Sequence, residues 1–220
     1  MSDAEGVIKY TLEFEPVTLA RLDSSLMSLV AEIDQWRQVF MGLGLIGQVP
    51  ERYHGLGFGN MSIRYSPLGA FLITGSQTSG LEWLSAEDCA LVSECDVARN
   101  RLVAQGNTPP SSEAMTHGAL YQQSMRVGAV IHVHSPVIWH ASAPLELPVI
   151  PEHIPYGTPA MADAVRQLWK ANSVAASGVF AMLGHEDGVV AWGDNIADAS
   201  MALLRVFSKA HRSSSMVFPD

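Results

Sequence analysis

Two histidines at alternate positions of one apolar segment are the first candidates for chemistry in this sequence. The run Val127–Ile131 leads directly into His132 and His134, a pattern typical of a buried strand. Residues i and i+2 of a strand point to the same face, so the two side chains should stand side by side, with bases roughly 6–7 Å apart. Two imidazoles so placed can converge on one divalent ion, and a carboxylate such as Glu113 could complete or oppose the site. The pair therefore predicts a metal centre.

The alternative for this pair is purely structural. The sequence contains 8 histidines in 220 residues, so chance alone can produce a His-x-His spacing. Buried histidines are also often satisfied by backbone carbonyl groups and have no further role. The surrounding sequence has to decide between the two interpretations.

Composition bounds the class of protein. With 48% hydrophobic and 16% charged residues, the chain is expected to form one globular domain over 1–220, with its core at about 20–210. The net charge of -9 argues against a nucleic-acid or anionic-membrane binder. The acidic start lacks the features of a signal peptide and no apolar run approaches 18 residues, which predicts a cytoplasmic protein. Cys89 and Cys95 are expected to be thiols without a role.

Hydrophobic periodicity predicts alternating strands and helices. Strands are expected over 7–15 (an edge strand or extended arm), 57–65, 70–74, 89–92, 127–134, 147–150, 179–183 and 189–192, with a polar hairpin over 96–105. Helices are expected over 18–41, after 108–113, and over 136–140, 159–171 and 194–211, with a tail over 213–220 that is mobile or packs on a neighbour. Together these elements predict an α/β fold, a three-layer α/β/α sandwich with a central mixed, mostly antiparallel sheet.

Polar residues cluster at two glycine-rich turns and one helix start. Asn60 and Ser62 follow the first turn, Thr74 and Gly75 open the second, and Pro110-Ser111-Ser112-Glu113 begins a helix with the glutamate in its first turn. Glycine allows backbone N–H groups to approach an anion closely, and the hydroxyl and amide side chains add donors. Each segment alone can equally be a simple turn or helix cap.

Taken in order, five short motifs resemble the class II aldolase and adducin head family. They are Gly59–Ser62, Ile73–Gly75, Pro110–Glu113, His132–Ser135, and His185 before Gly188–Gly193, and the resemblance covers roughly residues 20–210. It implies a divalent ion, usually zinc, held by three histidines, with His132 and His134 as the first two ligands and Glu113 as the acid/base. It also implies a homotetramer, and a phosphate cradle made by Asn60, Ser62, Thr74, Gly75, Ser111 and Ser112.

One departure from the family pattern concerns the third histidine. The family places it immediately before the glycine of the last turn, whereas here Asp187 precedes Gly188 and His185 lies two residues earlier. If the turn keeps strand-like geometry, His185 and Asp187 face the same way and either could reach the ion. We predict His185, because neutral imidazole suits a three-histidine zinc site. The acidic Glu82 near the second loop puts negative charge close to the expected phosphate position, which weakens the case for a phosphorylated substrate without removing it.

The function predicted from these residues is metal-dependent lyase chemistry. A substrate carbonyl and hydroxyl would chelate the ion, which stabilises an enediolate, while Glu113 transfers the proton. The leading prediction is aldolase-like cleavage of a small hydroxyketone or sugar phosphate, with a sugar-phosphate epimerase or dehydratase as the alternative. A non-catalytic, adducin-like binding head is the rival from another class, and it would lack the ligands and the glutamate that are present here.

Overall fold

The computed structural model describes residues 6–171, 174–175 and 178–217. Its strands form one mixed sheet in the order β1-β5-β4-β3-β2-β6-β9-β8-β7. The pairs β1/β5 and β7/β8 are parallel and the other six are antiparallel. The predicted α/β sandwich with a mixed, mostly antiparallel sheet is therefore confirmed. The strands are β1 (Thr11–Pro16), β2 (Asn60–Arg64), β3 (Phe71–Thr74), β4 (Cys89–Asp96), β5 (Arg101–Gly106), β6 (Ala129–His134), β7 (Val149–Ile150), β8 (Val179–Met182) and β9 (Gly188–Gly193).

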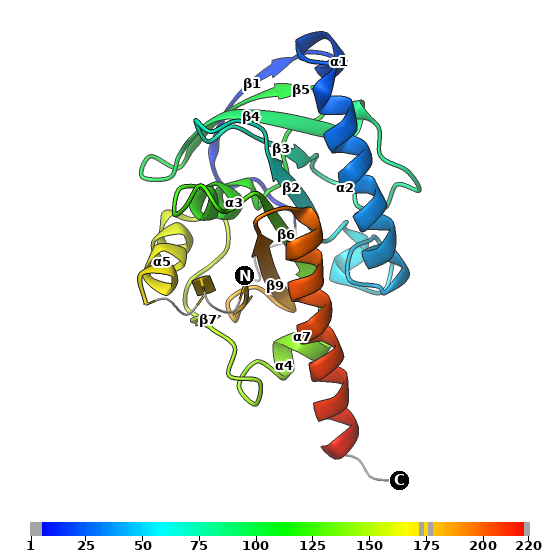
Figure 1. The fold of residues 1–220 in the computed structure, drawn as a ribbon, viewed down its shortest axis with the longest axis vertical. Coiled ribbons are helices and arrows are strands. Elements are labelled where there is room, and N and C mark those ends of the chain that lie inside the picture. The colour runs from blue at the N-terminus through cyan, green and yellow to red at the C-terminus, as the bar shows by residue number, and fades with distance from the viewer. Residues whose placement is uncertain (1–5, 172–173, 176–177, 218–220) are drawn as a thin grey trace.

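Helices cover both faces of this sheet, as Figure 1 shows, with α3 and α5 on one side and α2 and α7 on the other. Two separate apolar cores result, one under each helical layer. The central strands β2, β6 and β9 are consequently buried on both faces, so a polar side chain on either face lies inside the protein. The helices are α1 (Leu19–Leu22), α2 (Ser25–Gly42), α3 (Ala114–Tyr121), α4 (Pro136–His140), α5 (Pro159–Lys170) and α7 (Ile196–Val217), with 3-10 turns η1 (Tyr53–Gly55) and η2 (Ala86–Asp88).

Helix boundaries differ from the sequence prediction at three places. The single helix expected over 18–41 is interrupted, because the Asp23 carboxylate accepts the N–H of Ser25 at 2.8 Å and so ends α1 before α2 begins. Glu113 lies at the N-cap position of α3 rather than in its first turn. The last helix continues to Val217, so most of the predicted tail is helical, and 218–220 lie outside the described residues.

The N-terminal strand is an edge strand, as expected, but its partner is not its neighbour in sequence. β1 pairs in parallel with β5, the second strand of the predicted polar hairpin. Tyr10, just before β1, reaches the start of α3, where its hydroxyl donates to the carbonyl oxygens of Pro110 and Ser111 at 3.0 Å. The N-terminal segment therefore braces the Pro110–Glu113 motif. Within the described residues, none of the helices combines the length and apolarity needed to cross a membrane.

Candidate metal centre

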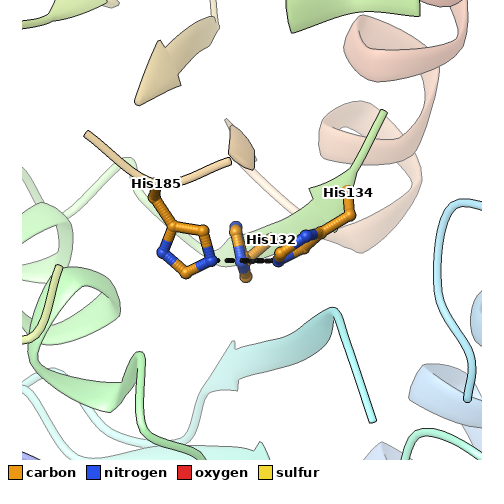
Figure 2. A group of neighbouring side chains, drawn as sticks. All are labelled: His132, His134 and His185. Atoms are coloured by element: carbon orange, nitrogen blue, oxygen red, sulfur yellow. Dashed lines mark hydrogen bonds between the residues drawn. The ribbon is translucent and has the colours of Figure 1, made fainter. Parts of the chain in front are cut away.

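Three buried histidines converge from two segments of the chain. His132 and His134 project from β6, between β2 and β9, and His185 lies in the turn between β8 and β9. Figure 2 shows their rings facing a common centre. The Nε2 atom of His134 lies 3.2 Å from Nε2 of His132 and 3.1 Å from Nε2 of His185. Ligands about 2.0–2.1 Å from a tetrahedral zinc ion lie about 3.3 Å apart, so these nitrogens have the spacing of a metal site.

The hydrogen-bond network indicates which ring nitrogens face that centre with lone pairs. Nδ1 of His132 lies 3.2 Å from the carbonyl oxygen of Val189, which can only accept, so Nδ1 carries the proton and Nε2 is unprotonated. Nδ1 of His185 lies 3.4 Å from Oε1 of Glu113, an arrangement typical of a carboxylate that orients a metal-binding histidine. Lone pairs that face one another at about 3 Å repel unless a cation lies between them. The donor set thus fits a divalent ion.

The pKa values of His134 and Glu113 favour cation binding at the cluster. Burial, followed by the nearby His185 and His132, holds the pKa of His134 well below its usual value, so this imidazole is neutral at physiological pH. Burial alone would raise the pKa of Glu113, but the hydrogen bond and charge of His185, then His132 and Thr116, lower it to about 2. A neutral His134 beside the ionised Glu113 carboxylate is a combination of protonation states that suits metal binding.

The structure separates His185 from Asp187, the two candidates for the third ligand. His185 belongs to the cluster of possible ligand atoms that lie within 4.8 Å of one another, together with His132 and His134. Asp187 instead accepts a hydrogen bond from the hydroxyl of Tyr53 at 2.7 Å. Its φ of 60° is left-handed, so the strand-like turn that would align both side chains does not form.

Glu113 is fully enclosed beside the cluster. Its Oε2 atom accepts a hydrogen bond from the Thr116 hydroxyl at 2.7 Å, and Oε1 faces His185. Only 1% of its surface is exposed, so the carboxylate is desolvated, and it lies beside His185 with His132 nearby. It can either transfer a proton or orient His185. These two roles make different predictions for a glutamine variant.

The loop expected to be irregular, which contains Tyr53, packs against His134 on the side of the cluster away from Glu113. Tyr53 lies against the ring of His134, with centroids 4.5 Å apart, while its hydroxyl holds Asp187. Arg52 donates to the Tyr53 hydroxyl at 2.8 Å and lies over the Phe58 ring at 4.3 Å. Tyr53 and His54 both have positive φ, a conformation costly for non-glycine residues. The sequence signal for this role was weak, because only the unusual Asp187 hinted at a partner.

Four of the six predicted phosphate-binding residues line one small cavity next to the cluster. Asn60, Gly75, Ser111 and Ser112 surround it, together with Gly6, Gly57, Gly59, Ser76, Gln77 and Ser79. The cavity and the metal centre meet where Asn60 pairs with His132 across β2 and β6, and where Ser112 adjoins Glu113.

Ser62 and Thr74 are not among the residues that line this cavity. The Ser62 hydroxyl lies 2.7 Å from Nδ1 of His117 and 2.7 Å from the hydroxyl of Tyr121, beneath α3. The Thr74 hydroxyl accepts the N–H of Met61 at 3.2 Å. The Ser62 hydroxyl therefore links β2 to α3, whereas the Thr74 hydroxyl links β3 to β2.

The sequence and the fold of this chain are similar to those of known proteins. Residues 50–210 match the model of the Class II Aldolase and Adducin N-terminal domain. Among solved structures, L-fuculose-1-phosphate aldolase from Thermus thermophilus is 22% identical, covers 87% of this chain and 98% of its own, and superposes with a TM-score of 0.60. A sugar-phosphate aldolase from Thermotoga maritima is 16% identical, with coverages of 89% and 99% and a TM-score of 0.62.

A third solved structure of similar fold has a name that covers several reactions. YgbL from Klebsiella pneumoniae, named as a candidate aldolase, epimerase or decarboxylase, is 19% identical, with coverages of 88% and 91% and a TM-score of 0.65. At such identities the likeness shows a common fold, while the reaction has to be argued from the residues of this chain.

Proposed function

Because this chain belongs to the Class II Aldolase and Adducin N-terminal domain family, we propose that it is a metal-dependent aldolase-like lyase acting on a small hydroxyketone or sugar phosphate. The observation that carries the proposal is the convergence of three Nε2 atoms beside a buried carboxylate. His132, His134 and His185 would hold the ion, which we propose to be zinc. When bound, the ion would supply Lewis-acid stabilisation of negative charge on a substrate oxygen.

The residues of the chain account for the remaining steps. Glu113, ionised and shielded from water, is the group available to take a proton from a substrate hydroxyl as the carbon–carbon bond breaks, and to return it to the product. Such proton transfer typically contributes about 100- to 10,000-fold. Thr116 fixes the carboxylate through its bond to Oε2. Asn60 and Ser112, which line the adjoining cavity, would orient the far end of the substrate.

Metal content and product identity test this proposal together. Protein purified without added metal should contain close to one divalent ion per chain, and the His132→Ala/His134→Ala double variant should contain none. The parent should release an aldehyde from members of a panel of ketose phosphates and hydroxyketones. Loss of water or epimerisation without aldehyde release would favour a dehydratase or an epimerase. A parent that takes up no zinc, manganese or cobalt would favour the binding-head alternative.

The oligomeric state and the cellular location of the protein are also proposals. We propose a homotetramer with sites near its subunit boundaries, as the sequence resemblance implies, in the cytoplasm. Light scattering of the metal-loaded protein should give a mass about four times that of the chain. A monomeric mass would contradict the proposed tetramer.

A further inference from the structure

The N-terminal segment, residues 6–10, reaches the site from outside the part of the chain that matches the family model, which is 50–210. Gly6 lines the small cavity beside the metal centre, and Tyr10 is buried against the turn that precedes α3. The segment runs directly into β1, which pairs with β5 at the edge of the sheet. The chain thus adds a piece of its own to the surroundings of the site.

The Tyr10 hydroxyl holds the turn that leads into Glu113. It donates to the carbonyl oxygens of Pro110 and Ser111, each at 3.0 Å. The Ser111 carbonyl oxygen also accepts the N–H of Ala114 at 3.0 Å. Burial, followed by the negative charge of Glu113, raises the pKa of Tyr10, so the hydroxyl keeps its proton and remains a donor. The turn that carries Glu113 is therefore fixed from outside α3.

The position of Glu113 explains why such support is needed. Glu113 is the N-cap residue of α3, yet its side chain does not cap the helix. An N-cap side chain ordinarily accepts one of the N–H groups at the start of a helix and stabilises that end. Here the carboxylate instead faces His185 and accepts the hydroxyl of Thr116. The residue that would ordinarily stabilise the start of α3 serves the metal centre, and Tyr10 stabilises the turn in its place.

Lys9 docks the same segment against the other member of the contact between Glu113 and His185. Its ammonium nitrogen lies 3.7 Å from the centroid of the Tyr156 ring, within the range of a cation–π interaction. The Tyr156 ring packs in turn on the His185 ring, with centroids 4.6 Å apart. Lys9 and Tyr10 are adjacent in the chain, and they support two residues whose side chains lie 3.4 Å apart.

We propose that Tyr10 is a positioning residue for Glu113. By fixing the turn before α3, its hydroxyl keeps the Glu113 carboxylate in the place beside His185 from which a proton can be transferred. This inference rests on the proposed lyase function and adds to it a residue that lies outside the matched residues 50–210. Misplacement of a reacting group by about 1 Å can cost about 100-fold in rate, so a single hydroxyl can matter at this distance from the chemistry.

Amide hydrogen exchange of the metal-loaded protein tests the contact without any need for turnover. Tyr10→Phe should speed exchange locally, at the N–H groups of residues 111–117, and leave the central strands β2, β6 and β9 as in wild type. Tyr65→Phe, which removes a hydroxyl bonded to Asp23, is the matched control and should leave residues 111–117 unchanged. Unchanged exchange at these residues in Tyr10→Phe, or equal acceleration throughout the chain, would overturn the proposal.

A double-mutant cycle tests whether Tyr10 acts through Glu113. At saturating metal, Tyr10→Phe should lower kcat by about 10- to 100-fold and change KM little. In the Glu113→Gln background the same substitution should lower the residual kcat no further, because the group that Tyr10 positions is gone. Equal losses in both backgrounds, or a kcat of Tyr10→Phe like that of wild type, would contradict the proposal. A failure of the lyase function shows separately, as missing metal or missing turnover in the parent.

Discussion

The metal centre and the adjoining cavity show opposite uses of polar residues. At the metal centre, three imidazoles from β6 and the β8–β9 turn direct their Nε2 atoms at one another, an arrangement that is unfavourable until a cation is added. At the cavity, backbone N–H groups of comparable number direct their bonds at the protein itself. Short polar motifs in the sequence thus lead to one histidine cluster whose nitrogen atoms fit a cation and to one cavity in which four of the lining N–H groups are bonded within the protein.

The largest expected effect comes from Glu113→Gln, which removes the carboxylate that lies 3.4 Å from Nδ1 of His185. Turnover should fall by about 100- to 10,000-fold, since glutamine cannot accept a proton, while metal content stays near that of the parent. Activity on the preferred substrate and metal per chain are measured together. Glu94→Gln, at an exposed ion pair with Arg101, is the control and should retain activity.

The glutamine variant also separates the two roles open to this carboxylate. If Glu113 only orients His185, the variant should lose about 10- to 100-fold in metal affinity and recover its activity when metal is added in excess. Full turnover at saturating metal would therefore remove Glu113 from the proton transfer.

The next comparison is between His185 and Asp187. His185→Ala should weaken metal binding by more than the roughly 100-fold upper range for residues that merely orient a ligand, because it removes one of three donors. Asp187→Asn keeps an acceptor for Tyr53 and should change metal affinity little. Competition with a chromogenic chelator measures both, and His153→Ala, in an exposed loop, is the control. A larger loss in Asp187→Asn would reverse the assignment of the third ligand.

Tyr53→Phe tests whether the strained loop positions the centre. The variant loses the hydroxyl that bonds to Asp187 and Arg52 but keeps the ring against His134. Metal affinity should fall by up to about tenfold, at the lower end of the range for outer-shell partners. Tyr65→Phe is a matched control, since its hydroxyl bonds to Asp23 and Tyr65 follows the end of β2 that is opposite Asn60 and the cluster. Equal effects in both variants would indicate general destabilisation rather than positioning.

These contrasts also show which features can be predicted from sequence. His132 and His134 were predictable because strand alternation fixes their common face, and the sheet layout followed from strong apolar periodicity. Asn60 and Ser62 share a face by the same rule, yet Asn60 lines the cavity and Ser62 is covered by α3. Strand alternation predicts the face of the sheet on which a side chain lies. Because β2 is buried on both faces, alternation does not predict which residues that side chain contacts.

Long-range contacts set the features that local patterns missed. The hydrogen bond between Tyr53 and Asp187 joins residues 134 positions apart, and the Gln77 amide reaches a turn 20 residues away. Neither pair has a periodic or motif signal. The break between α1 and α2 has a local cause, the cap made by Asp23. The apolar stripe of the sequence continues across this break, so periodicity alone predicted one helix.

The smallest expected effect concerns the polar group beneath α3, where Ser62 meets His117. Burial, and then the charge of nearby His132, lowers the pKa of His117 to about 3. The unfolded chain takes up a proton at this residue below about pH 6.5 and the folded chain does not. Stability should therefore be constant above pH 6.5 and fall on acidification towards pH 3, by at most about 1.4 kcal/mol per pH unit from this group.

Urea unfolding of metal-free protein at pH 7, 6 and 5 measures this dependence. His117→Gln should flatten the decline relative to wild type, whereas His54→Gln, at an exposed histidine, should leave it unchanged. An identical decline in His117→Gln and wild type would mean that His117 is protonated in the folded state. The Ser62–His117–Tyr121 group would then carry a positive charge inside the protein. Of the two polar regions compared with the histidine cluster, only the cavity would remain one whose hydrogen bonds are made within the protein.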